Sequence, residues 1–296
     1  MSPLPRQKIL LFGADGILGS AVAKRFSDAR LDDRSFELFE STELEGDITE
    51  REETILYIMS IAPSLVINCA GYTDVDGCES NTTQAYQVNA DGAAYIAEAC
   101  ENAGAKLIHI STEYVFDGTK DIPYTEDDTP NPLSEYGRSK TAGERAIQRR
   151  LKDCVIVRTS WLYGPNGKNF VDTVLRLADE KDEITMVNDQ RGAPTFTVDL
   201  ADGIYRLSKS GVNGIYHLAN GGWCTWYEFA EKALALAGKQ LKMRPVSSDE
   251  LNRPAARPRN CMLDCSKIER DTGIGLRPWA EALEDYLCRA AAPGAD

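Results

Sequence analysis

The first half of the chain alternates short apolar runs with longer segments of helical periodicity. Apolar runs that end in glycine or in a polar residue are typical of buried strands. We predict such strands at residues 8–13, 36–40, 65–71, 106–112 and 154–164. The segments between them predict helices over residues 17–26, 49–63, 81–104 and 134–147. This alternation predicts an α/β protein built on a doubly wound parallel sheet.

Two of these helices carry boundary signals in the sequence. Thr49 is followed three residues later by Glu52, a spacing that predicts a capping box at the helix start. Pro63 lies past the end of that helix, because proline has no backbone N–H to continue the ladder. Gly104 ends the next predicted helix, since glycine readily adopts the backbone conformation found after helix ends.

The pattern becomes mixed after about residue 161. Helical periodicity returns at residues 171–181, 200–209, 226–238 and 278–290. Strand-like runs are at 184–189 and 214–220, and the basic, proline-rich segment 253–260 predicts a loop. We therefore predict a first domain over residues 6–160 and a smaller C-terminal α/β part over 161–290. The two parts are interleaved, because some later strands return to the first sheet.

Composition and charge narrow the function classes. The 296 residues carry a net charge of -13, which argues against nucleic-acid binding, because such binding depends on a basic surface. No apolar run approaches the ~20 residues of a membrane span, and the polar N-terminus is unlike a signal peptide. We predict a cytoplasmic protein with no membrane partner. The 8 cysteines form no C-x-x-C pair and there are 2 histidines, so we predict reduced thiols and no metal site of the zinc type.

A glycine-rich loop follows the first predicted strand. Its glycines have the spacing G-x-x-G-x-x-G and are Gly13, Gly16 and Gly19. Such glycines permit a tight turn and close approach of the backbone to a diphosphate, and the following helix N-terminus favours the anion. We predict a Rossmann-like dinucleotide site here, to which Asp15, Ile17 and Leu18 also contribute. The first domain is then the NAD(P)-binding domain, and a plain turn is the alternative.

Acidic residues follow the second predicted strand. Glu40 lies about twenty residues beyond the glycine loop, where an acid bonds the adenosine ribose and repels the 2′-phosphate of NADP. No arginine follows it directly, although Arg25 and Arg34 are near in sequence. We predict NADH or NADPH, with a preference for NAD. Asp47, followed by Ile48, is placed to accept from the adenine amino group. The alternatives are a solvated strand end and a role at the helix start.

Tyr136 and Lys140 share one face of the predicted helix over residues 134–147. Residues four apart lie one helical turn apart, so the phenol and the ammonium are neighbours. The positive charge favours phenolate, and we expect it to lower the pKa of Tyr136 toward a range suited to proton transfer. An ordinary exposed helix is the alternative explanation of this pair.

Four stretches together resemble the extended short-chain dehydrogenase/reductase superfamily. They are GADGILG at 13–19, VINCAGYTDVDGCE at 66–79, HISTEYVFDGT at 109–119 and YGRSK at 136–140. Later stretches narrow the resemblance and are RTSWLYG at 158–164, NDQRGAPTF at 188–196, GIYHLANGGWCTWYEFA at 214–230 and RPRNCMLDCSKI at 257–268. From about residue 8 to 287 the chain is similar to the dTDP-4-dehydrorhamnose reductase family. The resemblance implies NAD(P)H-dependent reduction of the 4-keto group of a nucleotide-linked 6-deoxy sugar, dTDP-4-dehydro-L-rhamnose to dTDP-L-rhamnose.

The resemblance also implies which residues form the site. Thr112 would bond the substrate carbonyl oxygen, Tyr136 would protonate it as hydride arrives from the nicotinamide, and Lys140 would bond the nicotinamide ribose. The implied cofactor loop and its neighbours are Cys69, Ala70, Gly71, Tyr72, Asn89 and Ser111. The residues implied for the substrate are Thr112, Glu113, Trp161, Arg191 and Arg257, with Arg259 as a further candidate for the diphosphate. For Asn89, Trp161 and the arginines, the alternatives are a helix-kinking polar group, core packing and ordinary surface charge.

Three positions depart from the family pattern. Glu113 stands where the family has aspartate, which keeps the charge and adds one methylene. Cys69 and Gly71 stand where alanine is frequent. Some family members use Mg²⁺ bound by glutamates between subunits, so the resemblance allows a homodimer. No such ligands are identified here, and no metal is assigned.

Other functions stay open at this stage. A sugar-nucleotide 4,6-dehydratase has an Asp-Glu pair after the threonine, whereas here Glu113 is followed by Tyr114, so the second acid is missing. The sequence also leaves open an epimerase or a reductase of another nucleotide sugar, although the C-terminal half is of the reductase type. A branch of the same family is the non-catalytic, NADP-binding regulatory subunit of methionine adenosyltransferase. The intact set of Thr112, Tyr136 and Lys140 argues for an enzyme.

Overall fold

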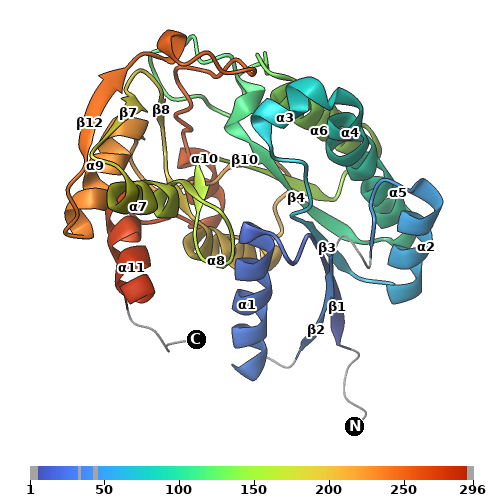
Figure 1. The fold of residues 1–296 in the computed structure, drawn as a ribbon. Helices are drawn as coiled ribbons and strands as arrows, with labels where there is room; N and C mark the ends of the chain where they lie inside the picture. Colours follow the sequence, from blue (N-terminus) through green and yellow to red (C-terminus); the bar gives the residue numbers. More distant parts are fainter. Residues whose placement is uncertain (1–5, 33–34, 43–45, 292–296) are drawn as a thin grey trace.

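The centre of the molecule is a six-stranded parallel sheet (Figure 1), seen in a computed structural model that describes residues 6–32, 35–42 and 46–291. The strand order is β10-β5-β4-β3-β1-β2. The strands are β1 Gln7–Phe12, β2 Phe36–Ser41, β3 Leu65–Asn68, β4 Lys106–Thr112, β5 Cys154–Thr159 and β10 Gly214–His217. The predicted doubly wound α/β fold is confirmed. The late strand β10 pairs with β5, so the chain returns to the first sheet after residue 161.

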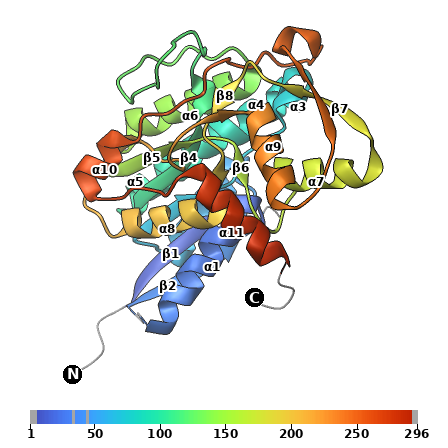
Figure 2. The same ribbon diagram turned by 90° about the vertical axis from the view of Figure 1, so that its left-hand side faces the viewer.

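Helices cover both faces of this sheet, as Figures 1 and 2 show. On one face lie α1 (Ile17–Asp32) and α8 (Thr197–Ser208), and on the other lie α2 (Arg51–Ile61), α5 (Ala93–Ala103) and α6 (Glu135–Arg150). Alternate residues of one strand serve the two cores. Leu11 packs with α1 and α8, whereas Leu10 packs with α2 and α5. The strands are continuously apolar for this reason, since neither face meets water.

The predicted capping box at Thr49 is wrong. The helix α2 begins at Arg51, its N-cap is Glu50, and no side chain caps it in the described structure. The backbone N–H and the hydroxyl of Thr49 both donate to Oδ1 of Asp47, at 2.8 and 2.7 Å. The local turn therefore uses the threonine before the helix starts. The far end agrees with the prediction, because the left-handed Ala62 follows Ile61 and precedes Pro63.

Two other predicted elements are interrupted. The helix expected over 81–104 consists of α4 (Thr82–Tyr86), the π-helical turn η1 (Gln87–Gly92) and α5, and it ends as predicted at the left-handed Gly104. The strand expected over 154–164 breaks after β5, because Trp161 has a φ of 45°. Such a φ is costly for a bulky residue. Both interruptions lie beside the site described below, where strained backbone tends to gather.

The C-terminal part is made of short paired strands and three larger helices. The strand pairs are β6 (Leu162–Tyr163) with β9 (Thr195–Phe196), β8 (Arg191–Gly192) with β11 (Cys224–Thr225), and β7 (Glu183–Val187) with β12 (Lys242–Val246). The helices are α7 (Phe170–Glu180), α9 (Trp226–Leu236) and α11 (Trp279–Ala291). An aromatic core that includes Tyr163, Phe196 and Phe229 joins them. The sequence patterns missed β12 and the short helix α10 (Ser266–Thr272). The division at residue 161 stays a prediction.

Within the described ranges, no helix has the length and apolar character that crossing a bilayer requires.

Candidate active site

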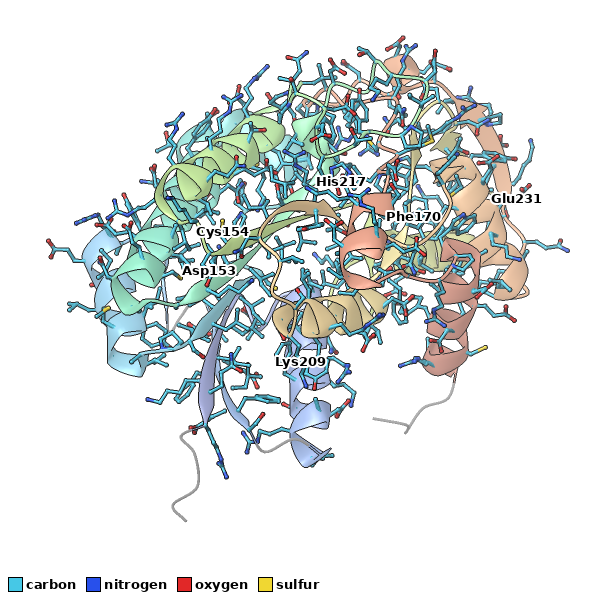
Figure 3. All side chains as sticks on the ribbon, turned by 180° about the vertical axis from the view of Figure 1, so that it is seen from behind. Asp153, Cys154, Phe170, Lys209, His217 and Glu231 are labelled. Carbon is cyan, nitrogen blue, oxygen red and sulfur yellow. The ribbon has the colours of Figure 1, made fainter. Side chains whose placement is uncertain are left out.

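The candidate site lies at the carboxyl ends of the parallel strands. Figure 3 shows Cys154 at the start of β5 and His217 at the end of β10, which marks the direction of the strands. At the carboxyl edge, the glycine loop follows β1, the loop from Cys69 follows β3, and Thr112 ends β4. Parallel sheets place their ligands at this edge. A cavity of about 400 Å³ opens between the first two loops.

Two glycines of the loop, Gly13 and Gly19, lie where a side chain does not fit. Gly13 has a φ of 71°, and a Cβ there would lie 2.6 Å from the backbone nitrogen of Ala70. A Cβ on Gly19 would lie 1.8 Å from the carbonyl oxygen of Gly13. The turn therefore brings backbone close to the cavity, and α1 begins directly after it at Ile17. The first-turn N–H groups of a helix suit a diphosphate, so these residues fit a dinucleotide.

Most of the predicted cofactor residues line this one cavity. The predicted residues among its lining are Gly13, Asp15, Gly16, Asp47, Ile48, Cys69, Ala70, Gly71 and Tyr72. Its lining also includes Thr42, Thr49, Gln84 and Val88, which were not predicted as cofactor residues. Thr49 stood out only as a helix cap. The other three carry no local signal, because their exposure to the cavity depends on how the loops fold.

The structure adds detail to three residues predicted near this cavity, whose roles stay predictions. Glu40 is exposed near the end of β2, and Thr42, two residues later, lines the cavity. The side chain of Leu18 is buried in the core, so only its backbone is available to a ligand. Arg25 pairs with Asp202 at 2.8 Å and is engaged on α8. Arg34 lies outside the described residues.

Asn89 and Ser111 support the site from behind. The amide of Asn89 donates to Tyr72 O and to Ser139 Oγ, both at 3.0 Å, and accepts from Tyr72 N at 2.9 Å. It thus holds the cofactor loop from the π-helical turn, and at 1% exposure it is covered by that loop. The Ser111 hydroxyl donates to Glu144, which also forms a buried ion pair with Arg158 at 2.7 Å. Both side chains are therefore bonded to protein groups in this structure. Their contact with a cofactor stays a prediction.

The helix α6 is positioned by its first turn. Ser134 is the N-cap and accepts from Gly137 N at 3.2 Å, and Glu79 accepts from Glu135 N at 2.8 Å. A Cβ on Gly137 would lie 2.2 Å from the carbonyl oxygen of Tyr114, so only glycine lets α6 approach the end of β4 this closely. This approach places Tyr136 beside Thr112.

Lys140 lies one turn further along α6, as its spacing predicted. Its Nζ donates to Ile110 O at 2.7 Å, and a Cβ on Gly71 would lie 3.8 Å from that nitrogen. The ammonium therefore faces the cofactor loop. The side chain is 5% exposed, and burial lowers the pKa of Lys140 to about 8.

Tyr136 is also buried, and its pKa differs from the sequence-based expectation. Burial raises the pKa of the Tyr136 phenol above its ordinary value, the nearby Glu113 raises it further, and its interaction with Thr112 opposes them. The expected lowering by Lys140 is therefore wrong in this state, because removal of the phenol from water outweighs it. A proton donor with a raised pKa keeps its proton at neutral pH.

Thr112 and Glu113 form a tight pair at the end of β4. The Thr112 hydroxyl donates to Glu113 Oε2 at 2.8 Å and accepts from Tyr114 N at 3.2 Å. Glu113 is 3% exposed, and burial raises the pKa of its carboxyl to about 7. A carboxyl in this environment exists in both protonation states near neutral pH.

A larger cavity of about 860 Å³ lies on the C-terminal side of Tyr114. Its walls come from α7, β7, α9 and the segment 248–259, and include Phe170, Gln190 and Trp226. Phe170, labelled in Figure 3, is the first residue of α7. None of these three was predicted as a site residue. The WYEFA stretch at 226–230 did mark Trp226 as part of a family motif.

Trp161 is placed differently from the prediction. It is 8% exposed and lies in the aromatic core, outside the cavity lining described. Its ring stacks on Trp226 with centroids 3.6 Å apart, so Trp226 covers it and presents the second ring to the cavity. Trp226 is fixed in turn, because its Nε1 donates to Gln190 Oε1 at 3.1 Å.

The three predicted arginines lie together, but they are not equivalent. Arg191 lines a neighbouring cavity of about 810 Å³, and Arg257 and Arg259 line both cavities. The guanidinium of Arg257 forms two hydrogen bonds of 2.9 Å to the carboxylate of Asp76 on α3 (Val75–Ser80). The same carboxylate accepts from Ala255 N at 3.1 Å. Asp76 therefore holds the segment over the cavity, and the pair lowers the pKa of its carboxyl.

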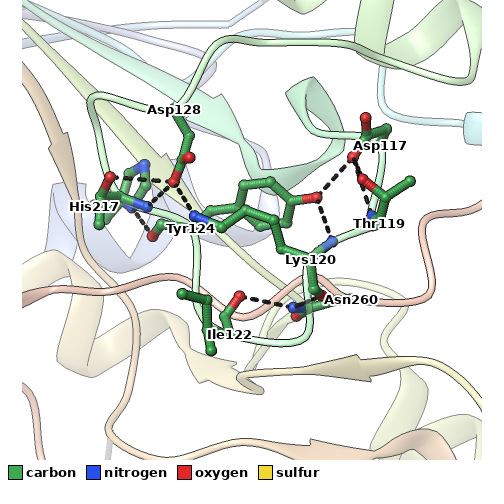
Figure 4. Close-up of polar contacts among 9 residues, drawn as sticks. Asp117, Thr119, Lys120, Ile122, Tyr124, Asp128, His217 and Asn260 are labelled. Atoms are coloured by element: carbon green, nitrogen blue, oxygen red, sulfur yellow. Dashed lines mark hydrogen bonds and ion pairs between the residues drawn. The ribbon is translucent and has the colours of Figure 1, made fainter.

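The loop after β4 is held by polar contacts, some within the loop and some to the C-terminal segment (Figure 4). The Tyr124 hydroxyl donates to Asp117 Oδ1 at 2.7 Å, and Lys120 pairs with Asp128 at 2.6 Å. The amide of Asn260 donates to Lys120 O at 2.6 Å and to Ile122 O at 2.9 Å. The two bonds of Asn260 tie the loop to the segment that carries Arg257 and Arg259.

Comparison with known proteins agrees with this geometry. Residues 7–292 match the family described as RmlD substrate binding domain. The chain is 40% identical over 304 residues to a dTDP-4-dehydrorhamnose reductase of Streptomyces griseus, covering 99% of this chain and 98% of that protein. It is 38% identical over 240 residues to a dTDP-4-keto-6-deoxy-D-glucose reductase of Streptomyces niveus, covering 80% and 83%. A crystal structure of dTDP-4-dehydrorhamnose reductase from Bacillus anthracis in complex with NADP superposes with a TM-score of 0.92, at 35% identity, covering 96% of this chain and 100% of that one.

Proposed function

We propose that this chain, which belongs to the RmlD substrate binding domain family, is an NAD(P)H-dependent sugar-nucleotide oxidoreductase. Its reaction is reduction of the 4-keto group of a dTDP-linked 6-deoxy sugar, dTDP-4-dehydro-L-rhamnose to dTDP-L-rhamnose. Named reductases that match over nearly the whole chain support this reaction.

One observation carries the proposal, namely the place of Tyr136 between the two cavities. Tyr136 packs with Tyr72, which lines the smaller cavity, and with Tyr114, which lines the larger one. A proton donor in this position can serve a ketone in one cavity while a bound dinucleotide lies in the other. The raised pKa of its phenol keeps the proton in place until negative charge develops on the ketone oxygen.

The chain's own residues then divide the work. Thr112 binds and orients the ketone oxygen, Tyr136 gives it a proton, and the buried ammonium of Lys140 holds the ribose and supports the phenolate that remains. Arg257, Arg259 and Arg191 face the diphosphate of the sugar nucleotide. The nicotinamide cofactor, when bound, supplies the hydride.

The cofactor preference is also proposed. Glu40 is exposed near the end of β2, two residues before Thr42, which lines the cavity. The Bacillus anthracis reductase was crystallised with NADP. We propose that both NADPH and NADH are used and that NADPH is accepted at least as well. The homodimer stays a prediction from the family resemblance.

The test is oxidation of NADPH and NADH with dTDP-4-dehydro-L-rhamnose as substrate, in wild type and Tyr136→Phe. Loss of the proton donor should lower kcat by about 10²–10⁴-fold, with cofactor binding unchanged. Tyr205→Phe, on α8 away from the site, is the matched control and should retain wild-type rates. Equal activity of Tyr136→Phe and wild type would refute the role of the phenol.

A second substrate is favoured by one relative, the dTDP-4-keto-6-deoxy-D-glucose reductase of Streptomyces niveus. The same assay with dTDP-4-keto-6-deoxy-D-glucose decides between the two sugars by their kcat/KM values. Cofactor binding without turnover of either sugar would contradict the proposal and turn attention to the regulatory-subunit alternative. Co-purification with a methionine adenosyltransferase would support that alternative.

A further inference from the structure

The hydrogen bonds of Thr112 leave its hydroxyl no proton for a substrate. A hydroxyl has one donor and two acceptor positions. Thr112 Oγ1 accepts from Tyr114 N at 3.2 Å and donates to Glu113 Oε2 at 2.8 Å. The remaining position is a lone pair, and a ketone oxygen, which is itself an acceptor, cannot bond to it. In this arrangement Thr112 cannot orient the ketone.

The partner of Thr112 determines the direction of that bond. An ionised carboxylate only accepts hydrogen bonds, so an ionised Glu113 always takes the Thr112 proton. A neutral carboxyl also has an O–H to donate. If Glu113 donates to Thr112 Oγ1, the two acceptor positions of that oxygen are filled by Glu113 and by Tyr114 N. The threonine O–H is then released to the side of Tyr136, with which Thr112 interacts, and can bond to a ketone oxygen bound there.

The surroundings of Glu113 favour the neutral form. The carboxyl is 3% exposed, and this burial disfavours its ionised form. Its hydrogen bonds to Thr112 and to its own backbone N–H favour the ionised form, but their effect is smaller. The titratable groups that interact with it are Tyr136 from α6, Tyr114 from η2 (Glu113–Val115), and Cys261 from the C-terminal segment. Burial raises the pKa of all three, so they are uncharged at neutral pH. Arg257, which interacts with Tyr114, is paired with Asp76.

We propose that Glu113 works in its neutral form, as a positioning residue that donates to Thr112 Oγ1 and turns the threonine O–H toward the ketone oxygen. The inference rests on the proposed reductase function. The proton that reaches the product still comes from Tyr136, and Glu113 itself is unchanged by the reaction. Deprotonation of Glu113 reverses the bond and withdraws Thr112 from the substrate.

The first test needs no substrate. Infrared difference spectra between pH 6 and pH 8, for the NADP-bound enzyme, should show a carboxylic-acid C=O band that is lost as the pH rises. Glu113→Gln should lack this band. Glu126→Gln is the control, because Glu126 is another partly buried carboxyl with a raised pKa and lies outside the site. If the wild-type spectrum at pH 6 contains no carboxylic-acid band that Glu113→Gln removes, the proposal is overturned. This outcome does not depend on whether the enzyme reduces the sugar tested.

The second test is the pH dependence of kcat with the sugar nucleotide. Wild-type kcat should fall up to tenfold per pH unit above about pH 7, where Glu113 ionises. Glutamine has the shape of the neutral acid and always has an N–H to donate, so the kcat of Glu113→Gln should stay level between pH 6 and pH 7, where that of wild type begins to fall. A fall at higher pH remains, because the pKa of Lys140 is about 8.

Two outcomes of this second test would overturn the proposal. One is a Glu113→Gln enzyme that binds NADPH but loses its activity at pH 6, since the negative charge would then be required. The other is a falling limb at the same pH in both proteins. Glu113→Asp carries the family residue, and its kcat should again fall as the pH rises. Its activity would also show that the position tolerates substitution.

Discussion

The catalytic side of the site and its substrate side are built in different ways. On the catalytic side, Thr112 and Tyr136 come from the end of a six-stranded sheet and from the first turn of a long helix. On the substrate side, the larger cavity is lined by α7, β7, the start of α9 and the irregular segment 248–259 that carries Arg257. Arg257 is held there by Asp76, which is 181 residues away in the sequence.

This difference explains which residue roles were visible from sequence. A residue at a strand end or at i and i+4 on a helix has its position set by the element that carries it. A residue on an irregular segment has its position set by its partners. Trp161 and Arg257 both matched family motifs, but one is stacked behind Trp226 and the other is engaged with an aspartate.

The largest expected effect is on the catalytic side. Gly137→Ala places a Cβ 2.2 Å from the carbonyl oxygen of Tyr114, so the start of α6 must move away from β4. We expect stability to fall by about 1–3 kcal/mol and kcat to fall about 100-fold, because Tyr136 moves with the helix. Urea unfolding and steady-state assays measure the two effects. Gly211→Ala is the control, since a Cβ there meets nothing within 4 Å. Wild-type kcat in Gly137→Ala would show that this close approach does not position the phenol.

The next effect separates two ion pairs on the substrate side. In the Asp76–Arg257 pair the side chains are 34% and 12% exposed, whereas in the Asp249–Arg259 pair they are 81% and 62% exposed. Asp76→Asn should raise KM for the sugar nucleotide at least tenfold with kcat within about threefold, because a partly buried arginine loses its fixed position. Asp249→Asn should change KM less than about twofold, since exposed pairs contribute little.

Titration of NADPH binding completes this comparison. We expect the same affinity in Asp76→Asn and wild type, and partial rescue of KM in Asp76→Glu, which keeps the charge. A loss of NADPH affinity equal to the rise in KM would mean that Asp76 serves the cofactor loop instead of Arg257.

The smallest effect distinguishes the two stacked tryptophans. Trp226→Phe removes a ring edge that lines the cavity and its bond to Gln190, so KM should rise about threefold with little loss of stability. Trp161→Phe leaves a gap in the core and should lower the free energy of unfolding by roughly 1–2 kcal/mol, with KM unchanged. Trp223→Phe, at a residue 51% exposed, is the control. The reverse pattern would restore Trp161 as the residue that contacts the sugar.

Much of the fold and half of the site followed from local sequence. The parallel sheet, the glycine loop and the proximity of Tyr136 and Lys140 were predicted, because strand alternation and helical spacing act over a few residues. The capping prediction failed where a neighbour intervened, because Thr49 bonds Asp47 instead of capping α2. The role of Glu40 stays a prediction.

The charge states illustrate the same limit. From the sequence, a lysine one turn from Tyr136 was expected to lower the pKa of the phenol. In the structure the phenol and the ammonium are both buried, and burial raises the pKa of one and lowers that of the other. Desolvation depends on every residue that covers a group, so spacing along a helix cannot supply it.

By itself the sequence determined the α/β class, the glycine loop and the pairing of Tyr136 with Lys140, because each depends on residue type and short spacing. Thr112 joined this pair through the family resemblance. Only the tertiary structure decided that Asp76 holds Arg257, that Trp226 covers Trp161, and that Glu113 is buried against Thr112. The first two contacts join segments that are far apart in the sequence, and the burial of Glu113 depends on the segments that pack over it. Burial, and the protonation and hydrogen bonding that follow from it, exist only after that packing is complete.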